Sequence, residues 1–228
     1  MLSFIVKRVG LSILTLVIVS VIIFLMTSIL PGDIAKQTLG RDASPEAYEI
    51  WNKEKGFDKP LVVQYGRWMG GVMTGDLGTS FKFEKPVSAV LGPAAGKSAQ
   101  LAIVALILIA PISILGGIAA AMNRGKKVDR ILTVGGLSAA VIPEFVWGVV
   151  LILLFGVVFR IFPVSAFPNE ENPNLVNTVY HLLLPSIALL FVLFGYISRI
   201  TRAGVVEALD SDYMRTAVLK GLSRKTAV

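Results

Sequence analysis

The sequence predicts an all-α membrane protein folded as a polytopic helical bundle. Hydrophobic residues make up 54% of its 228 residues and charged residues only 16%, whereas an average soluble domain carries about 25% charged residues. A soluble domain of this length could not bury so much apolar surface in one core. Four stretches of the chain are also apolar enough to cross a bilayer as helices, which takes about 20 residues each.

The first span is predicted within residues 1–30, where Lys7 and Arg8 precede a charge-free run. A secretory signal peptide is the competing interpretation, but its apolar region is about 7–15 residues long and ends at a small-residue cleavage site. This run is longer and is followed by Pro31-Gly32-Asp33. We therefore expect an uncleaved span with a short cytoplasmic N-terminal end.

Residues 31–99 are predicted to form an external helical segment rather than a disordered linker. Ser44 followed by Pro45 and Glu46 is typical of a helix start, and that helix should run to about residue 55. Residues 60–74 have near-helical apolar spacing, and the glycine-containing stretch 75–80 predicts a turn. The segment's two tryptophans either pack it internally or anchor it at the membrane interface.

The second span is predicted at about 100–122, although it contains Pro111 and the pair Gly116-Gly117. Membrane helices tolerate such residues when neighbouring groups satisfy the freed backbone. Small residues also let two helices approach closely. We therefore expect this span to pack tightly against another helix.

The next apolar run, 131–162, is too long for one straight span. As a helix it would extend roughly 48 Å, against a hydrocarbon core of about 30 Å. Pro143 lies near its middle, which predicts an interfacial or cytoplasmic piece at about 127–141 and a third span at about 143–160. A fourth span is predicted at 181–200, with a proline in its first turn.

The short loop 123–130 sets the predicted orientation, because the positive-inside rule is strongest in short loops. Its basic residues are Arg124, Lys126, Lys127 and Arg130. We expect this loop, the N-terminus and the chain from about 199 onward to be cytoplasmic. Segments 31–99 and 159–180 would then lie outside.

The cytoplasmic region 203–228 is predicted to contain two short helices joined at a glycine. In the first, 212–220, an acid at the start and Lys220 at the end match the helix dipole. Gly221 is suited to end it in the left-handed conformation, and Ser223 can cap the second. This compact element could dock into a partner, and the alternative is a basic segment that touches anionic lipid.

The first of these helices resembles a known sequence motif. Asp212-Tyr213 precedes Arg215-Thr216-Ala217-Val218-Leu219-Lys220-Gly221, which is similar to the cytoplasmic loop of ABC-importer permeases in the dipeptide, oligopeptide and nickel branch. Further stretches resemble the same family in the same order along the chain. They are Phe4-Ile5-Val6-Lys7-Arg8, Leu30-Pro31-Gly32-Asp33, Gly75-Asp76-Leu77-Gly78-Thr79-Ser80, Ile142-Pro143 with Phe145, and Pro163-Val164-Ser165.

The resemblance implies a permease subunit of a type I ABC importer, moving peptides, nickel or related small solutes by alternating access. Residues 96–228 would be a partial transmembrane domain. With residues 1–30, four of an expected six spans would be present, in a chain truncated at its C-terminus. The expected location is the inner membrane of a bacterial or archaeal cell. The implied partners are a second homologous permease subunit, two ATPase subunits, an external substrate-binding protein and the lipid bilayer.

The same resemblance implies a role for the tail helix. It would be a coupling helix that carries motion between an ATPase subunit and the transmembrane cavity. The residues implied in coupling are Asp212, Tyr213, Arg215, Thr216, Ala217, Lys220 and Gly221. The chain itself would bind no cofactor, since ATP and magnesium would be held by the partner ATPases.

Glu144 is the single acidic residue within a predicted span. An intramembrane carboxylate is costly and usually faces a cavity or a partner, so Glu144 is a candidate for lining the translocation path. The alternative is a wetted residue near the cytoplasmic end of its span, or one paired with a basic loop residue. The sequence leaves both interpretations open.

Several classes of function are excluded by residue content. The chain has no cysteine and a single histidine, His181, which excludes thiol nucleophiles, disulfides and Cys- or His-clustered metal sites. It lacks the phosphate-loop motif and the common hydrolase motifs, so we expect no enzyme, no catalytic residue and no metal site. Its net charge of +7 is spread over membrane loops, and no nucleic-acid partner is expected. The competing classes are an interaction-only four-span protein and a channel or secondary transporter that acts alone.

Overall fold

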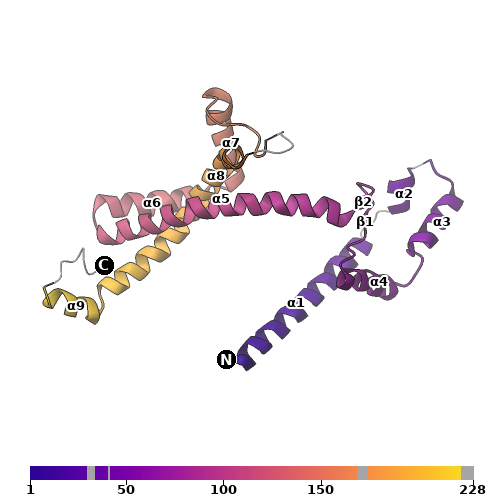
Figure 1. Cartoon of the computed structure of the whole chain (residues 1–228), viewed down its shortest axis with the longest axis horizontal. Helices are drawn as coiled ribbons and strands as arrows, with labels where there is room; N and C mark the ends of the chain where they lie inside the picture. Colours follow the sequence, from indigo (N-terminus) through magenta and orange to yellow (C-terminus); the bar gives the residue numbers. More distant parts are fainter. Residues whose placement is uncertain (30–33, 41, 169–173, 222–228) are drawn as a thin grey trace. The chain divides into compact units, whose positions relative to one another are not determined.

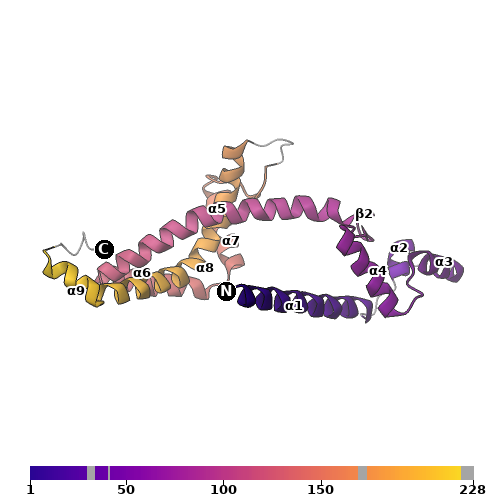
Figure 2. The same ribbon diagram turned by 60° about the horizontal axis from the view of Figure 1, so that its bottom comes forward.

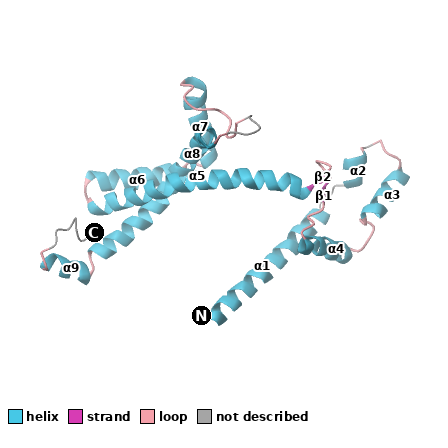
Figure 3. Cartoon of the chain, in the orientation of Figure 1, coloured by secondary structure: helices cyan, strands magenta, loops and turns pink. Residues whose placement is uncertain are grey.

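The computed structural model describes residues 1–29, 34–40, 42–168 and 174–221. The chain divides into two compact units, residues 1–95 and 96–228 (Figure 1). Within the described residues the regular structure is helical apart from one pair of two-residue strands (Figure 3). The predicted class, an all-α polytopic membrane protein, is therefore confirmed.

In the first unit, α1 (Leu2–Ile29) is the longest helix within residues 1–86. It is one of three helices in the described chain that are long and apolar enough to cross a membrane. Nearly all of its described side chains are exposed within the unit. Most of the surface of α1 is thus available to lipid or to other helices.

Three shorter helices follow: α2 (Ile34–Leu39), α3 (Pro45–Lys55) and α4 (Leu61–Thr74). The predicted start of α3 is confirmed, because Ser44 Oγ accepts a hydrogen bond of 3.2 Å from the backbone N–H of Ala47. Gly56 ends this helix with a φ of +76°, which is a conformation that glycine adopts without steric cost.

The glycine-rich stretch after α4 contains more structure than the predicted turn. Gly75 and Gly78 have positive φ angles, and the chain then forms a small hairpin. Strand β1 (Thr79–Ser80) pairs antiparallel with β2 (Lys85–Pro86). Phe81, in the hairpin loop, lies against Trp51 of α3, with ring centroids 5.6 Å apart, so the hairpin packs on the helical part of the unit.

Helix α5 (Val87–Met122) is longer than the predicted span of 100–122. It has 36 residues, or about 54 Å of helix. Gly92, Pro93 and Gly96 look like helix breakers in the sequence, yet all three lie inside the helix. Its early start was therefore missed.

The long apolar run after α5 is divided at Pro143, as predicted. Helix α6 (Lys127–Val141) ends there, and α7 (Glu144–Leu151) begins at a bend of 96°. The π-helical segment η1 (Ile152–Val158) continues α7 with wider turns. The α6–α7–η1 segment raises the number of candidate spans from three to four if it is counted as one broken span.

Helix α8 (Leu175–Leu209) is also longer than the predicted span of 181–200. The side chain of Asn174 caps its start by accepting a hydrogen bond of 2.7 Å from the N–H of Asn177. One expectation for this helix was wrong as a result: Pro185 lies in the helix interior rather than in the first turn. His181 is a half-buried residue within the helix.

Close backbone packing joins α5, α6 and α8 (Figure 1, Figure 2). A Cβ atom on Gly195 of α8 would clash with the backbone of Gly136 in α6. One on Gly117 of α5 would lie 2.6 Å from the carbonyl oxygen of Ser198. Small residues therefore bring these helices together, as expected for α5 from its glycine pair.

Candidate coupling site

The candidate coupling helix is present as α9 (Asp212–Leu219). Two residues separate it from the end of α8 at Leu209, and Asp212 lies in its first turn. Thr216 Oγ donates a hydrogen bond of 2.9 Å to the carbonyl of Asp212, and the N–H of Lys220 donates one of 3.0 Å to the carbonyl of Thr216. Gly221 then has a φ of +90°, so the predicted glycine stop is confirmed.

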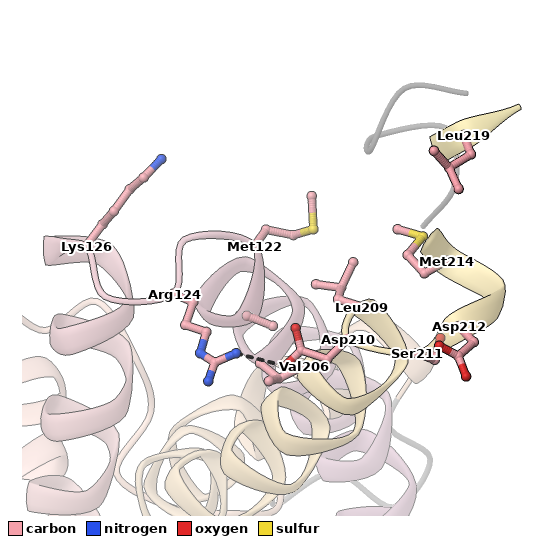
Figure 4. Close-up of a pocket in the computed structure, with 11 residues that line it drawn as sticks. Met122, Arg124, Lys126, Val206, Leu209, Asp210, Ser211, Asp212, Met214 and Leu219 are labelled. Atoms are coloured by element: carbon pink, nitrogen blue, oxygen red, sulfur yellow. Dashed lines mark hydrogen bonds and ion pairs between the residues drawn. The ribbon is translucent and has the colours of Figure 1, made fainter. Parts of the chain in front are cut away.

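A hollow of about 630 Å³ lies beside α9 (Figure 4). Its lining comes from the end of α5, the α5–α6 turn, the end of α8 and α9 itself. The lining residues are Ala121, Met122, Arg124, Lys126, Val206, Leu209, Asp210, Ser211, Asp212, Met214 and Leu219. The site is thus a groove with polar and apolar lining residues that ends at α9.

Met214 faces inward from α9 and is only 5% exposed. Leu219, at the other end of α9, is 82% exposed although it also lines the hollow. Burial of one apolar side chain holds a short helix that would be marginal in isolation. Neither residue was among the predicted coupling residues.

The predicted coupling residues share one short element, but the structure does not gather them around one point. Asp212 lines the hollow, whereas the side chain of Thr216 is exposed. Tyr213, Arg215 and Ala217 also lie within α9. Lys220 and Gly221 follow the helix. The predicted second helix after Ser223 falls outside the described residues.

An exposed ion pair connects the α5–α6 turn to the end of α8. Arg124 Nη1 lies 3.0 Å from Asp210 Oδ2 (Figure 4). The two side chains are 60% and 67% exposed, so water weakens their attraction. The pair nevertheless joins two parts of the groove lining, the α5–α6 turn and the end of α8.

A second, buried ion pair lies nearby and was missed in the sequence. Asp129 of α6 accepts two hydrogen bonds from Arg202 of α8, at 2.6 Å from Nε and 2.8 Å from Nη2. The Gly125 N–H donates a third bond, of 2.9 Å, and Thr133 Oγ a fourth, of 3.3 Å. The carboxylate is therefore fully hydrogen-bonded, as a buried charge requires.

The sequence contained only a weak signal for this pair. Asp129 is the one acid in the basic loop 123–130, and Arg202 is one of several basic residues after the fourth predicted span. Their partnership depends on the register of α6 against α8, which no local pattern encodes.

Glu144 lies in the first turn of α7, directly after the 96° bend, and its side chain is exposed. A carboxylate is favourable near a helix N-terminus. The length of α6, roughly 20 Å, separates Glu144 from the basic loop 123–130. None of the ion pairs found among the described residues involves it, so pairing with that loop is not observed.

Trp147 holds the geometry of the bend next to Glu144. Its Nε1–H donates a hydrogen bond of 3.0 Å to the carbonyl of Ala139, on the other side of the break. Its ring packs on Phe191 of α8, with centroids 4.5 Å apart. Trp147 thus ties α6, α7 and α8 together.

The described residues contain no group of three or more His, Asp or Glu side chains that could hold a metal ion. The site is therefore a structural and electrostatic one: a short helix, an adjoining groove and two ion pairs that fix the neighbouring helix ends.

The structure defines the class as a helical, multi-span membrane protein with a short helix after its last long helix. The chain belongs to the family described as binding-protein-dependent transport system inner membrane component, which matches residues 112–228. The N-terminal model of the same transport systems matches residues 1–102. This family comprises permease subunits of ABC importers, which are not enzymes. Its members work with a substrate-binding protein and an ATPase.

Curated relatives are similar over almost the whole chain. A putative peptide transport system permease protein of Brucella abortus (strain 2308) is 34% identical over 224 residues, covering 98% of this chain and 71% of that protein. The dipeptide transport system permease protein DppB of Escherichia coli (strain K12) is 34% identical over 251 residues, covering 100% and 74%. The resemblance to ABC permeases is therefore confirmed.

Proposed function

We propose that this chain is the permease subunit of an ATP-driven importer whose cargo is a peptide. The relatives that match nearly the whole chain are named as peptide or dipeptide transport permeases, and this observation carries the proposal. Nickel or another small solute is the second candidate cargo, from the wider resemblance of the motifs. Alternating access would move the cargo, powered by separate ATPase subunits.

The proposed assembly contains this chain, a second homologous permease, two ATPase subunits and an external substrate-binding protein. The proposed topology places residues 31–99 outside and the groove beside α9 in the cytoplasm, in the inner membrane of a bacterial or archaeal cell. The basic loop 123–130 supports this orientation through the positive-inside rule. ATP and magnesium would bind to the ATPase partners and not to this chain.

We propose α9 as the element that contacts an ATPase. Three observations support this: α9 is a separate short helix, one apolar residue fixes it to its own chain, and its Thr216 side chain remains exposed. A helix held on one side and free on the other can seat in a partner's groove and transmit its displacement. The proposed contact residues are Asp212, Tyr213, Arg215, Thr216, Ala217, Lys220 and Gly221.

The test is co-purification of the ATPase subunits with Ala217→Asp, which places a charge in the motif. We expect loss of ATPase association and of peptide uptake, because an unpaired charge in a docked surface is costly. Glu207→Gln, at an exposed position of α8 before the motif, is the matched control and should retain both. An unchanged ATPase association in Ala217→Asp would contradict the docking role of α9.

The wild-type chain separates the competing classes. Absence of any ATPase partner in the purified complex would favour an interaction-only protein. Uptake by the chain alone in liposomes would favour a channel or secondary transporter. Competition of uptake by dipeptides, but not by nickel ions, would support the proposed cargo.

We further propose that Glu144 lines the translocation path. Its support is an exposed carboxylate at the bend of a broken span, remote from the basic loop. Glu144→Gln should reduce uptake several-fold while leaving ATPase association intact, because it removes charge and keeps size. Uptake equal to that of wild type would remove Glu144 from the path.

A further inference from the structure

Helix α4 packs against the side of α1 rather than beyond its end. The hydroxyl groups of Ser20 in α1 and Tyr65 in α4 share a hydrogen bond of 2.8 Å. Phe24 of α1 contacts Tyr65 edge-on, with ring centroids 5.4 Å apart, and stacks on Trp68 at 6.2 Å. These three aromatic rings place the middle of α4 beside residues 20–24 of α1.

The depth of that contact in the membrane follows from the sequence of α1. The charge-free part of α1 runs from Val9 to Ile29, about 30 Å of helix, which equals the hydrocarbon thickness of a bilayer. Ser20 is nine residues before Ile29, so it lies about 14 Å from that end, and Phe24 lies about 8 Å from it. Both contacts with α4 therefore fall within the hydrocarbon layer.

The polar side chains of α4 are arranged for such an environment. Gln64 donates to the carbonyls of Phe57 and Lys59, at 3.2 and 2.7 Å, and Thr74 donates to the carbonyl of Gly71 at 2.9 Å. Groups that are satisfied within the protein do not need water.

Arg67 is the one charged residue of α4. A Cβ atom built on Gly56 would lie 2.5 Å from Arg67 Nη1, so the guanidinium lies over the α3–α4 turn. Long basic side chains commonly reach from an apolar position toward the polar interface in this way.

One face of α4 is apolar and mostly exposed within its unit. Val62, Gly66, Met69 and Met73 are spaced at helical intervals and form what we call the α4 stripe. Val62 is 82% exposed and Met73 is 80% exposed. The stripe adjoins the α1-facing side of α4, so it lies at the same membrane depth.

We propose that α4 is embedded in the leaflet at which α1 ends, with the α4 stripe in contact with lipid acyl chains. Residues 31–99 would then not be wholly external: α4 would be a membrane-inserted helix between the polar helix α3 and the hairpin. Lipid is the expected occupant of the α4 stripe for two reasons. The stripe lies beside the part of α1 that is within the hydrocarbon layer, and it continues the exposed surface of that span. This inference is independent of the transported cargo and of the ATPase contact.

Spin labelling provides the test, since the sequence contains no cysteine. Val62→Cys and Met73→Cys are labelled with a nitroxide in the full chain, reconstituted with its co-purifying partners in liposomes of the host's lipids. Power saturation then compares collisions with oxygen, which concentrates in lipid, and with a water-soluble nickel chelate. We expect high oxygen and low nickel accessibility at both positions.

Two matched positions calibrate the measurement. Leu16→Cys, exposed on α1, gives the lipid reference, and Glu49→Cys, exposed on α3, gives the water reference. Nickel accessibility like that of Glu49→Cys would overturn the proposal in favour of an external helix. Low accessibility to both reagents would overturn it in favour of a protein partner on the stripe.

A second measurement avoids labels on the stripe. In the variant with Trp51→Phe and Trp147→Phe, Trp68 is the remaining tryptophan of the three in the chain. Its fluorescence should be quenched by lipids brominated near mid-chain and less by lipids brominated only at the headgroup end. If neither lipid quenches the fluorescence of Trp68, α4 lies outside the bilayer.

Discussion

At the scale of single residues, the Asp129–Arg202 pair is the contact that most strongly specifies how α6 meets α8. Asp129 is 7% exposed and accepts four hydrogen bonds. Such a pair is weak evidence of net stabilisation, but removal of one partner leaves an uncompensated charge. The main contribution of the pair is therefore to fix the register of α6 against α8.

Asp129→Ala should lower the free energy of unfolding by about 2–4 kcal/mol, because Arg202 loses a bidentate partner in a largely buried site. The measurement is thermal unfolding of the purified protein in detergent. Arg124→Ala, which breaks the exposed pair with Asp210, is the control and should cost about 0–1 kcal/mol. Equal losses in the two variants would contradict the distinct role of the buried pair.

The glycines of α8 offer a second residue-level comparison. Gly195→Ala should lower the melting temperature and the yield of folded protein, because the new methyl group meets the Gly136 backbone, which cannot move aside cheaply. Gly204→Ala, in the same helix but with no atom within 4 Å of the new Cβ, should stabilise by up to about 1 kcal/mol through helix propensity. A stable Gly195→Ala would mean that α6 and α8 are less closely packed than described.

At the scale of elements, the bend between α6 and α7 depends on Trp147. Trp147→Phe keeps the ring against Phe191 but removes the hydrogen bond to Ala139 across the break. We expect a loss of about 0.5–1.5 kcal/mol and faster labelling of a cysteine placed at Ile142, next to the bend. Phe191→Leu, which weakens the ring contact alone, is the comparison. Unchanged labelling in Trp147→Phe would assign the bend to Pro143 alone.

Local signals predicted the elements whose causes are local. The Ser44 cap, the break at Pro143 and the stop at Gly221 each act within a few residues, and each was found where the sequence placed it. The lengths of α5 and α8 were underestimated. Asn174 caps α8 earlier than predicted, and Gly92, Pro93 and Gly96 do not break α5.

Features that depend on tertiary contacts were not predictable. The π-helical turns of η1 and the Asp129–Arg202 register have no sequence pattern of their own. For the candidate site, resemblance supplied the motif in α9, whereas the groove and the buried Met214 required the structure.

At the scale of the whole molecule, the packing of the second unit determines how many times its chain crosses the bilayer. The Arg124–Asp210 pair brings the end of α5 next to the end of α8. Both helices are long enough to span, and two spans with these ends adjacent would cross in the same direction. The intervening α6–α7–η1 segment would then return the chain across the membrane, which favours the count of four crossings with α1.

Four crossings predict that the N-terminus and the end of α8 lie on one side. Ser3→Cys and Glu207→Cys in the cysteine-free sequence should be protected from a membrane-impermeant thiol reagent in intact cells and labelled after permeabilisation. Val164→Cys, in the loop between η1 and α8, should be labelled in intact cells. Opposite accessibility of Ser3→Cys and Glu207→Cys would instead support three crossings.

The continuity of α8 has a mechanical consequence. Gly195, where α8 meets the α6 backbone, lies 15 residues from both Tyr180 and Asp210, or about 22 Å along the helix in each direction. A rigid rod with its fulcrum at Gly195 would convert each ångström of movement beside α9 into an opposite movement of similar size at Tyr180. Tyr180 donates a hydrogen bond to the Ile161 carbonyl in the loop after η1. Spin labels can be placed on the two halves of α8, one on the Tyr180 side of Gly195 and one on the Asp210 side. Their pulsed dipolar distances, measured with and without nucleotide, would change together if α8 moves as such a lever.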